Sequence, residues 1–243
     1  MSVLRINNHT FYPYLVHKDR RPTNLCLLSS NNYLSNGFLV AKDHLYPNKP
    51  KSSKIYACFA TYLEFYLWMR YLPSIERNFY EIIHMGPQKP HFDIDIEVFD
   101  KDGKLKSKGV TLDNFMEIGT ATRNNLLAAC IELFGEYGHS LTYSKFVITD
   151  SSTNNKYSCH VIIDENFHHN EKDAKEFYNL VVAKMDKSFQ SYVDHAVYGK
   201  NQQFRLLGHN KINKTKVKRV DPVTTWQPSE DCSDENIFQL RLF

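Results

Sequence analysis

The sequence has no paired cysteines, no long hydrophobic run and no marked excess of charge of either sign. Its five cysteines stand singly and form no C-x-x-C pair, which argues against both a disulfide framework and a zinc ribbon. No stretch approaches the roughly 18 uninterrupted apolar residues that a membrane-spanning helix needs. The first residues, MSVLRINNHTF, contain no apolar segment of the kind found in signal peptides. We therefore expect a protein that is soluble, not secreted, and located in a reducing compartment, either cytoplasmic or nuclear.

The overall charge is uninformative, but its distribution is not. A net charge of +3 over 243 residues is too small to identify a polyanionic partner, and 42% hydrophobic residues exclude global disorder. Between residues 200 and 219, however, there are seven basic residues and no acid. These residues are Lys200, Arg205, Lys211, Lys214, Lys216, Lys218 and Arg219. A local positive field of this kind favours phosphate groups, and a solvated run of charge is the alternative.

The hydrophobic pattern changes along the chain. Residues 1–53 are rich in Asn, Ser, Lys and Pro and predict an irregular N-terminal lobe. In residues 54–90 the pattern predicts a strand, a helix and a second strand, which form a small α/β unit. In residues 91–219 it predicts a strand at HFDIDIEVF, helices over 111–135 and 171–190, and two adjacent strands at KFVITD and YSCHVII. We expect an α/β (α+β) fold in which helices cover a sheet, with residues 54–243 forming one catalytic domain.

The strand FDIDIE carries acids on one face. Asp93 and Asp95 are two residues apart, so their carboxylates project from the same side, and Glu97 extends the row. Such carboxylates are ligands for Mg²⁺ or Mn²⁺, and a row of like charges destabilises a strand unless something neutralises it. This pattern favours a metal site. The alternative is the solvent-facing side of an amphipathic strand.

Two later segments carry groups that suit phosphate. Lys156, Ser158 and His160 share one face of the strand KYSCHVII, where an ammonium, a hydroxyl and an imidazole converge. His160 can equally be an ordinary, partly buried histidine. In VDHAVYGKNQQFRL, Asp194 is explained as well by a cap or turn, and Arg205 by a charge on an edge strand.

Other familiar motifs are absent or defective. Residues 208–215, GHNKINKT, resemble a P-loop, but Asn213 stands where the second glycine is needed. There is no G-x-S-x-G and no H-E-x-x-H. Cys159 and His160 are adjacent on a strand, so their side chains point to opposite faces and do not form a catalytic pair.

Taken in order, the segments FDID, KYSCHVII and VDHAVYGKNQQFRL resemble the three motifs of the archaeo-eukaryotic primase superfamily. The resemblance runs from about residue 54 to 211. It is closest to the eukaryotic primase-polymerase and to the N-terminal primase domain of primase-helicases from poxviruses and other large DNA viruses. It implies an RRM-like antiparallel sheet with packed helices, a smaller α/β unit at the N-terminal side and an active cleft between them.

The resemblance also implies roles for individual residues. Asp93, Asp95 and Asp194 correspond to catalytic acids that bind two Mg²⁺ or Mn²⁺ ions. The nucleotide-binding residues would be Lys156, Ser158, His160, Arg205 and Lys211, with a looser match at Lys54. Beyond the resemblance, Lys214, Lys216, Lys218 and Arg219 are candidates for contacts with single-stranded DNA, and Tyr198 or Trp226 for stacking on its bases.

The implied function is template-directed synthesis of primers on single-stranded DNA from NTPs or dNTPs during replication, which would place the protein at a viral replication site. Gln202 and Gln203 depart from the arginine and asparagine often found in the family, and the chain carries neither a zinc-binding cluster nor a helicase ATPase. A helicase, C-terminal or separate, is a further candidate partner, and a membrane is not.

Two alternative functions stay open. One is a metal-dependent nuclease using the same acids, which would need a lysine or general base near them that IDIEVF does not supply. The other is a module that binds nucleotide or single-stranded DNA without turnover.

Overall fold

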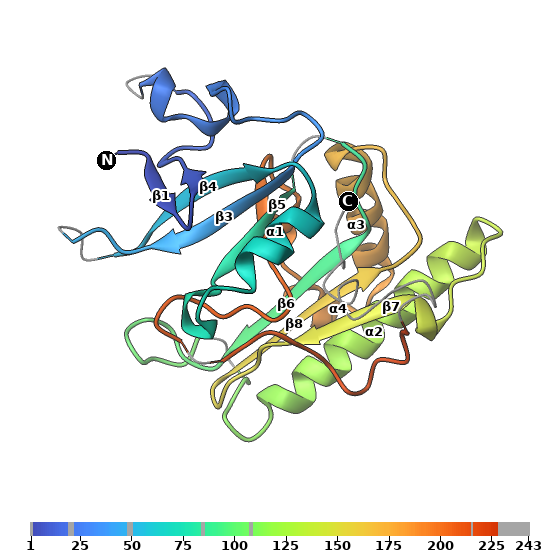
Figure 1. The fold of residues 1–243 in the computed structure, drawn as a ribbon. Coiled ribbons are helices and arrows are strands. Elements are labelled where there is room, and N and C mark those ends of the chain that lie inside the picture. Colours follow the sequence, from blue (N-terminus) through green and yellow to red (C-terminus); the bar gives the residue numbers. More distant parts are fainter. Residues whose placement is uncertain are drawn as a thin grey trace. The chain divides into compact units, whose positions relative to one another are not determined.

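The computed structural model describes residues 2–18, 22–47, 51–83, 86–106, 109–214 and 216–227. Mixed helices and antiparallel sheets make up the fold, as the sequence predicts (Figure 1). The chain divides into two compact units. The described residues of unit 1 come from Met1–His84 and Asn201–Lys218, and those of unit 2 from Met85–Lys200 and Arg219–Pro228.

Unit 1 is built on a four-stranded antiparallel sheet with the strand order β4-β3-β5-β9, to which a two-stranded sheet, β1-β2, is added. Its strands are β1 (Leu4–Ile6), β2 (His9–Phe11), β3 (Phe38–His44), β4 (Ser53–Phe59), β5 (Phe79–Ile83) and β9 (Gln202–Arg205). Its helices are α1 (Tyr62–Met69) and the 3-10 turns η1 (Thr23–Leu25), η2 (Leu27–Ser29) and η3 (Ser74–Glu76). The predicted strand-helix-strand unit is thus present as β4, α1 and β5.

Helix α1 begins where the sequence Thr-Tyr-Leu-Glu provides a capping box. The Thr61 hydroxyl accepts a hydrogen bond from the Glu64 N–H at 3.1 Å, and the Glu64 carboxylate accepts one from the Ala60 N–H at 2.6 Å. The helix then packs Phe65 and Met69 into the unit 1 core.

The predicted boundary between an irregular lobe and the rest of the chain, at residues 53 and 54, is wrong. Strand β3 pairs with β4 along its whole length, from Phe38 opposite Phe59 to His44 opposite Ser53, so the boundary cuts through a β-hairpin. In addition, the segment Asn201–Lys218 returns to unit 1, where β9 pairs with β5.

Unit 2 holds the second four-stranded antiparallel sheet, with the order β10-β7-β8-β6. Its elements are β6 (His91–Glu97), α2 (Phe115–Glu136), η4 (Tyr143–Lys145), β7 (Phe146–Asp150), β8 (Lys156–Ile163), α3 (Glu171–Lys184), α4 (Lys187–Gln190), η5 (His195–Tyr198) and β10 (Arg219–Val220). Val193 adds an isolated bridge to Ile94 on β6. The path β6-α2-β7-β8-α3 followed by this bridge is the split β-α-β arrangement expected of an RRM-like sheet.

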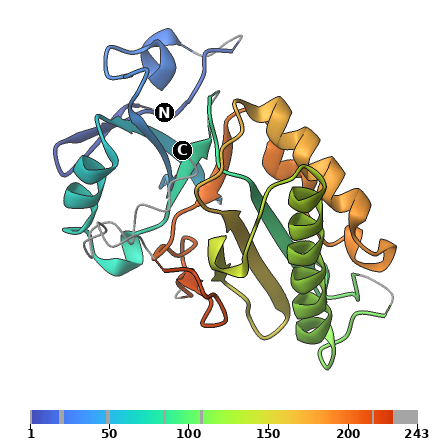
Figure 2. The same cartoon turned by 90° about the vertical axis from the view of Figure 1, so that its right-hand side faces the viewer.

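One face of this sheet is apolar and is covered by α2, which lies beside α3 (Figure 2). Phe92, Ile94 and Ile96 of β6 are buried there, because alternate residues of a strand point to the same side. Gly119 lets the helix approach the sheet closely, since a Cβ at this position would meet the ring of Tyr157 on β8. The opposite face of the sheet carries the acids.

The second predicted helix, over 171–190, is shorter than expected. Helix α3 starts at an Asn170 cap that accepts hydrogen bonds from two backbone N–H groups, and it ends at Lys184 because Met185 is extended. The Asp186 N–H then donates to Asn125 of α2, and α4 follows as a separate turn. None of the helices in the described ranges is long and apolar enough to cross a membrane. The cysteines of the described residues, Cys26, Cys58, Cys130 and Cys159, are buried and form no disulfide with one another, and Cys232 lies outside those residues.

Candidate active site

The two motif strands of unit 2 are neighbours in the sheet. Strand β6 pairs with β8 in an antiparallel register that sets Asp93 opposite His160, Asp95 opposite Ser158 and Glu97 opposite Lys156. Residues directly opposite one another in such a ladder share a face, with Cβ atoms about 5 Å apart. The register therefore brings the acids of the first motif against the basic and hydroxyl groups of the second.

Lys156 neutralises part of the acidic row. Its ammonium lies 2.5 Å from Oδ2 of Asp95 and 3.1 Å from Oε1 of Glu97. Burial alone would lower the pKa of Lys156, but the two carboxylates outweigh it and raise that pKa above its ordinary value. The repulsion that favoured a metal in the sequence is thus already reduced by a lysine from the next strand.

Glu97 holds a second lysine as well. Its Oε2 lies 2.7 Å from the ammonium of Lys106, which a hairpin turn brings back to the end of β6. The hydrogen bond from Lys106, followed by that from Lys156, lowers the pKa of Glu97 to about 2. Lys106 was missed in the sequence, although the turn KDGK just before it gave the signal that the chain reverses there.

The other end of the acidic row is more enclosed. Nε2 of His160 lies 3.5 Å from Oδ1 of Asp93, and the His160 side chain is 8% exposed. On the far side of β8, Thr149 lies opposite His160 in the register of β7. Ser158, between His160 and Lys156, is held by the loop before β8, since its N–H donates to Ser152 and its hydroxyl accepts from Ser151.

The backbone of Asp194 lies beside Asp93. The Asp194 N–H donates to the Asp93 carbonyl at 2.8 Å, next to the Ile94–Val193 bridge. Tyr178 of α3 fixes this segment by donating its hydroxyl to the Val193 carbonyl at 2.8 Å. The Asp194 carboxylate caps η5 by accepting from the Ala196 N–H, also at 2.8 Å, which is the role that the cap interpretation gave it.

The two acids of β6 fit a hard divalent cation, and the third acid is engaged elsewhere. Carboxylate oxygens are the preferred ligands of Mg²⁺ and Mn²⁺. Oδ1 of Asp95 is buried and has no hydrogen-bond partner among the described residues. Within the same residues, no three Asp, Glu, His or Cys side chains are arranged to hold a metal ion. The donor set that fits is therefore Asp93 and Asp95, with Asp194 placed beside them by its backbone and held as a cap by its carboxylate.

The basic residues predicted to contact phosphate belong mainly to unit 1. Arg205 lies at the end of β9 opposite Tyr80, and Lys54 lies 2.9 Å from Asp43 and above the Tyr80 ring. The pKa of Lys54 is lowered to about 8, first by burial and further by the charges of Lys211 and Arg205, although Asp43 opposes the shift. Lys54, the loosely matched residue, thus lies close enough to Arg205 and Lys211 for their charges to affect it, and Asp43 forms an ion pair with Lys54. Neither Asp43 nor Tyr80, whose hydroxyl donates to Asp43 at 3.0 Å, was picked out from the sequence.

The segment that follows is a hairpin and not a P-loop. Asn210 bridges Val217, and Asn213 has a positive φ of 58° at the turn, with no helix in the described residues of this segment. Lys211, Lys214 and Lys216 are exposed along it. Buried His209 anchors its base by accepting a hydrogen bond from the Phe79 N–H.

Three other residues do not take the place expected of a nucleic-acid contact. Lys218 is 2% exposed and donates to the Arg205 carbonyl at 2.8 Å, so it supports the hairpin from within. Tyr198 is buried and donates its hydroxyl to the His91 carbonyl, and Trp226 donates to Asp164. Lys218 and Tyr198 thus have structural roles in the protein interior, and Trp226 is partly buried with its indole N–H bound to Asp164. Arg219, in contrast, is exposed on β10 of unit 2.

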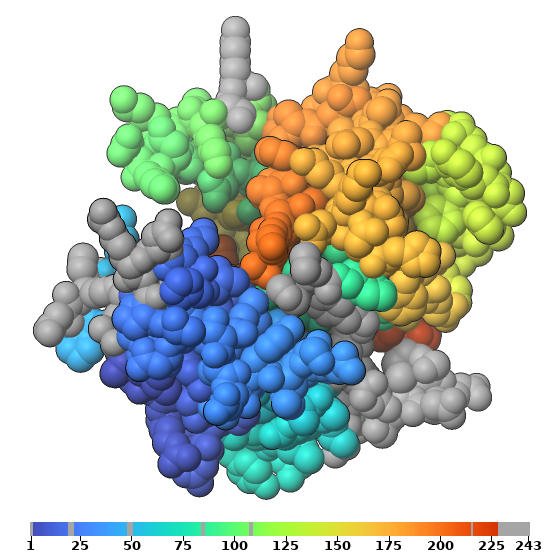
Figure 3. Space-filling model, turned by 90° about the horizontal axis from the view of Figure 1, so that it is seen from above, coloured from blue at the N-terminus to red at the C-terminus, as the bar shows by residue number. Residues whose placement is uncertain are grey.

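A cavity of about 360 Å³ lies away from this site, between α2 and α3 on the helical layer of unit 2. Its lining includes Phe134, Tyr137 and Phe177 and the acids Asp173 and Glu176. In Figure 3 the yellow-green end of α2 adjoins the orange α3 in this region.

The nuclease alternative was disfavoured because no lysine lies near the acids in the sequence, and that argument is wrong. Lys156 is 61 residues from Asp95 along the chain and 2.5 Å from it in space. Strand pairing brought the lysine to the acids from a distant segment.

No family model matches this chain. Two African swine fever virus proteins, each named as a helicase/primase complex protein, are similar to it. The protein from isolate Pig/Kenya/KEN-50/1950 is 27% identical over 192 residues, which cover 76% of this chain and 17% of the relative. The protein from strain Badajoz 1971 Vero-adapted is 27% identical over 198 residues, which cover 76% and 18%. The chain thus spans less than a fifth of the length of these relatives.

Proposed function

We propose that this chain acts in viral DNA replication as a metal-dependent primase of the archaeo-eukaryotic type, which joins nucleotides on a single-stranded DNA template. The observation that carries the proposal is the β6–β8 register, in which three acids face a histidine, a serine and a lysine. The names of the two relatives support a role in replication and a helicase as partner.

In this proposal each residue has a role that its position allows. Asp93 and Asp95 hold Mg²⁺ or Mn²⁺, and Asp194 joins them when its carboxylate leaves the Ala196 N–H that it caps. A divalent cation bound there supplies charge neutralisation and makes a 3′-hydroxyl a better nucleophile. Lys156, Ser158 and His160 donate hydrogen bonds to the triphosphate of the incoming nucleotide, since all three are donors on one strand face.

The cationic residues of unit 1 have roles in the same proposal. Arg205 and Lys211, grouped with Lys54, bind phosphate. The exposed Lys214 and Lys216 of the hairpin, and Arg219 on β10, bind the DNA backbone, whose affinity for such residues is largely electrostatic. Lys218 is left out because it is buried.

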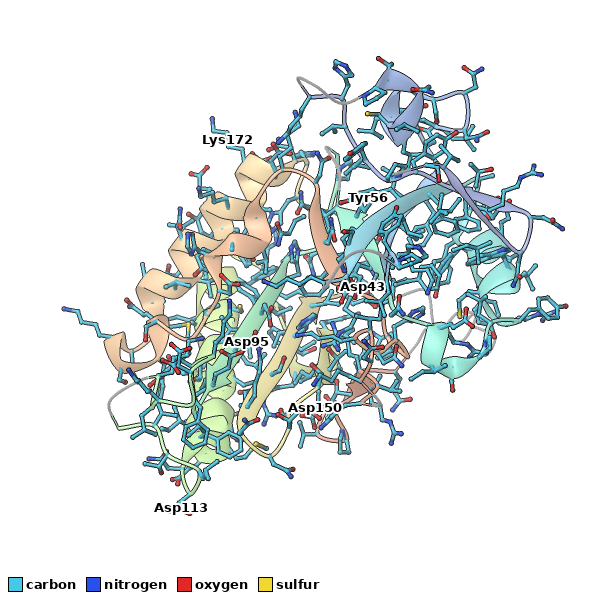
Figure 4. All side chains as sticks on the ribbon, turned by 90° about the vertical axis from the view of Figure 1, so that its left-hand side faces the viewer. Asp43, Tyr56, Asp95, Asp113, Asp150 and Lys172 are labelled. Carbon is cyan, nitrogen blue, oxygen red and sulfur yellow. The ribbon has the colours of Figure 1, made fainter. Side chains whose placement is uncertain are left out.

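The test is synthesis on single-stranded DNA with labelled nucleotides and either Mn²⁺ or Mg²⁺. We expect the wild-type chain to make oligonucleotides and the Asp93→Ala, Asp95→Ala double variant to make none while still binding DNA. Asp113→Ala, which removes an exposed acid of unit 2 (Figure 4), is the matched control and should leave synthesis unchanged. Wild-type chain that binds Mn²⁺ and DNA and makes no product refutes the proposal.

A metal-dependent nuclease is the second candidate, and the contact between Lys156 and Asp95 favours it. In such an enzyme the lysine would assist a water nucleophile beside the carboxylates. Degradation of a 5′-labelled strand that needs both Asp95 and Lys156, without incorporation of nucleotides, would establish this function instead. Binding of DNA or nucleotide with neither reaction would indicate the binding module.

A further inference from the structure

A chain of alternating charges runs along the polar edge of the candidate site. Lys106 contacts Oε2 of Glu97 at 2.7 Å, Oε1 of Glu97 contacts Lys156 at 3.1 Å, and Lys156 contacts Oδ2 of Asp95 at 2.5 Å. The side chains of Asp95 and Glu97 are 36% exposed, and that of Lys156 is 18% exposed. Lys156 is therefore the most enclosed member of this chain and the one shared by two carboxylates.

The two carboxylates around Lys156 are not equivalent. Both oxygens of Glu97 are engaged by ammonium groups, whereas Asp95 has one oxygen on Lys156 and one buried oxygen without a donor among the described residues. An ammonium and a divalent cation repel each other and need the same oxygen lone pairs. Both oxygens of Asp95 are thus available to a cation only when Lys156 leaves it. Both oxygens of Glu97 already form ion pairs with lysines.

We infer that Lys156 competes with a divalent cation for Asp95, and that Glu97 is a positioning residue that receives Lys156 when it leaves. The inference rests on the proposed cation site at Asp93 and Asp95 and goes beyond it, because it assigns Glu97 to the lysine and not to the metal. Lys156 lies directly opposite Glu97 in the register and reaches back to Asp95. The transfer therefore needs only rotation about side-chain bonds of Lys156, with no movement of either strand.

This exchange couples cation binding to nucleotide binding. When Lys156 is displaced from Asp95, its ammonium becomes able to donate to a phosphate oxygen. Linkage then requires that a nucleotide which takes Lys156 also tightens cation binding at Asp95. Lys106 also affects this exchange. It forms an ion pair with Glu97 and so weakens the attraction of Glu97 for Lys156.

The experiment measures Mn²⁺ binding to the full chain without nucleotide or DNA, from the electron paramagnetic resonance signal of free Mn²⁺. We expect Lys156→Met to tighten Asp95-dependent binding by about three- to tenfold, since a partly exposed ion pair no longer opposes it. Glu97→Gln should weaken binding by about two- to threefold. Lys172→Met, which removes an exposed lysine at the start of α3 (Figure 4), should change nothing. A thermal unfolding curve for each variant confirms that it is folded.

The double variant separates exchange from a general effect of charge. If Glu97 acts through Lys156, Glu97→Gln should lose most of its effect in the Lys156→Met background. Equal effects in both backgrounds would refute the role of Glu97, and unchanged or weaker binding in Lys156→Met would refute the competition. Absence of Asp95-dependent Mn²⁺ binding in every variant also refutes the inference. Wild-type chain that shows the exchange and makes no primers would refute the proposed function alone.

Discussion

Replacing Gly119 by alanine should destabilise the protein, although alanine is the better helix former. Gly119 lies inside α2, and an added Cβ would lie 2.5 Å from Cδ1 and Cδ2 of Tyr157 and closer still to Cγ. Tyr157 is 3% exposed and sits between Lys156 and Ser158 on β8. The ring is fixed by its strand, so helix and sheet must separate. Overpacking of this kind costs about 1–3 kcal/mol, and the gain in helix propensity is at most about 1 kcal/mol.

The same helix offers the control. A Cβ at Gly135 would meet nothing within 4 Å, so Gly135→Ala should be neutral or stabilising by up to about 1 kcal/mol. We expect a net loss of about 1–2 kcal/mol for Gly119→Ala. At about 2–4 °C per kcal/mol for a chain of this size, its thermal midpoint should fall by roughly 2–8 °C, while that of Gly135→Ala should not fall. Circular dichroism melting of both variants and the wild type measures this. Equal or higher midpoints for both variants would show that α2 and β8 are not packed as described.

Two further predictions concern unit 1. Burial, with the nearby charges of Arg77 and Lys42, lowers the pKa of His209 to about 3, so between the ordinary histidine pKa of 6.5 and 3 the unfolded chain binds a proton that the folded chain excludes. The stability contributed by neutral His209 is therefore complete above about pH 6.5 and falls as the pH falls. The variant His209→Asn can still accept a hydrogen bond from the Phe79 N–H. Its urea unfolding midpoint should depend less steeply on pH between about pH 6.5 and 4 than that of the wild type. The same pH dependence of the urea midpoint in wild type and His209→Asn would contradict this explanation. Thr61→Ala should lower the unfolding free energy by about 1 kcal/mol, because the α1 cap is lost. Thr61→Ser keeps the hydroxyl and should keep most of this stability. If urea titrations show the same loss of stability for both variants, Thr61 does not act as a cap.

Much of the fold was predictable because its signals are local. The alternation of Phe92, Ile94 and Ile96 with acids predicts β6, and the spacing of apolar residues predicts α1 and α2. The capping sequences that start α1 and α3 are likewise visible within four residues of the chain. These features depend on periodicity and hydrogen bonding between near neighbours, which the sequence displays directly.

Strand β3 was missed because its second half is charged. Lys42 and Asp43 resemble surface residues, yet they are 5% and 9% exposed. Lys42 is buried because it donates to Asn78 and to the Glu76 carbonyl, and Asp43 because it accepts from Lys54 and Tyr80. Partners from other elements compensate the cost of burying each charge, and such partners cannot be identified from the strand alone.

The motif residues were found in the sequence, but their pairing was not. The acids and Lys156 lie about 60 residues apart, and nothing in either strand states which residue faces which. The missed contact between Lys156 and Asp95 led directly to the mistaken argument against a nuclease. In the same way, the charge of Lys218 suggested a DNA contact, whereas the fold uses its ammonium to hold the Arg205 carbonyl.

The charges of the candidate site also help to choose the register that creates it. A slip of β6 against β8 by one residue would turn every apolar side chain to the wrong face, so hydrophobic burial excludes it. A slip of β6 against β8 by two residues leaves each apolar side chain on the apolar face of the sheet. Hydrophobic burial therefore disfavours this slip less strongly. It would, however, separate Glu97 from Lys156 and Asp93 from His160, which lie opposite each other in the observed pairing. The residues proposed to bind the cation and nucleotide therefore contribute to the strand alignment on which that binding depends.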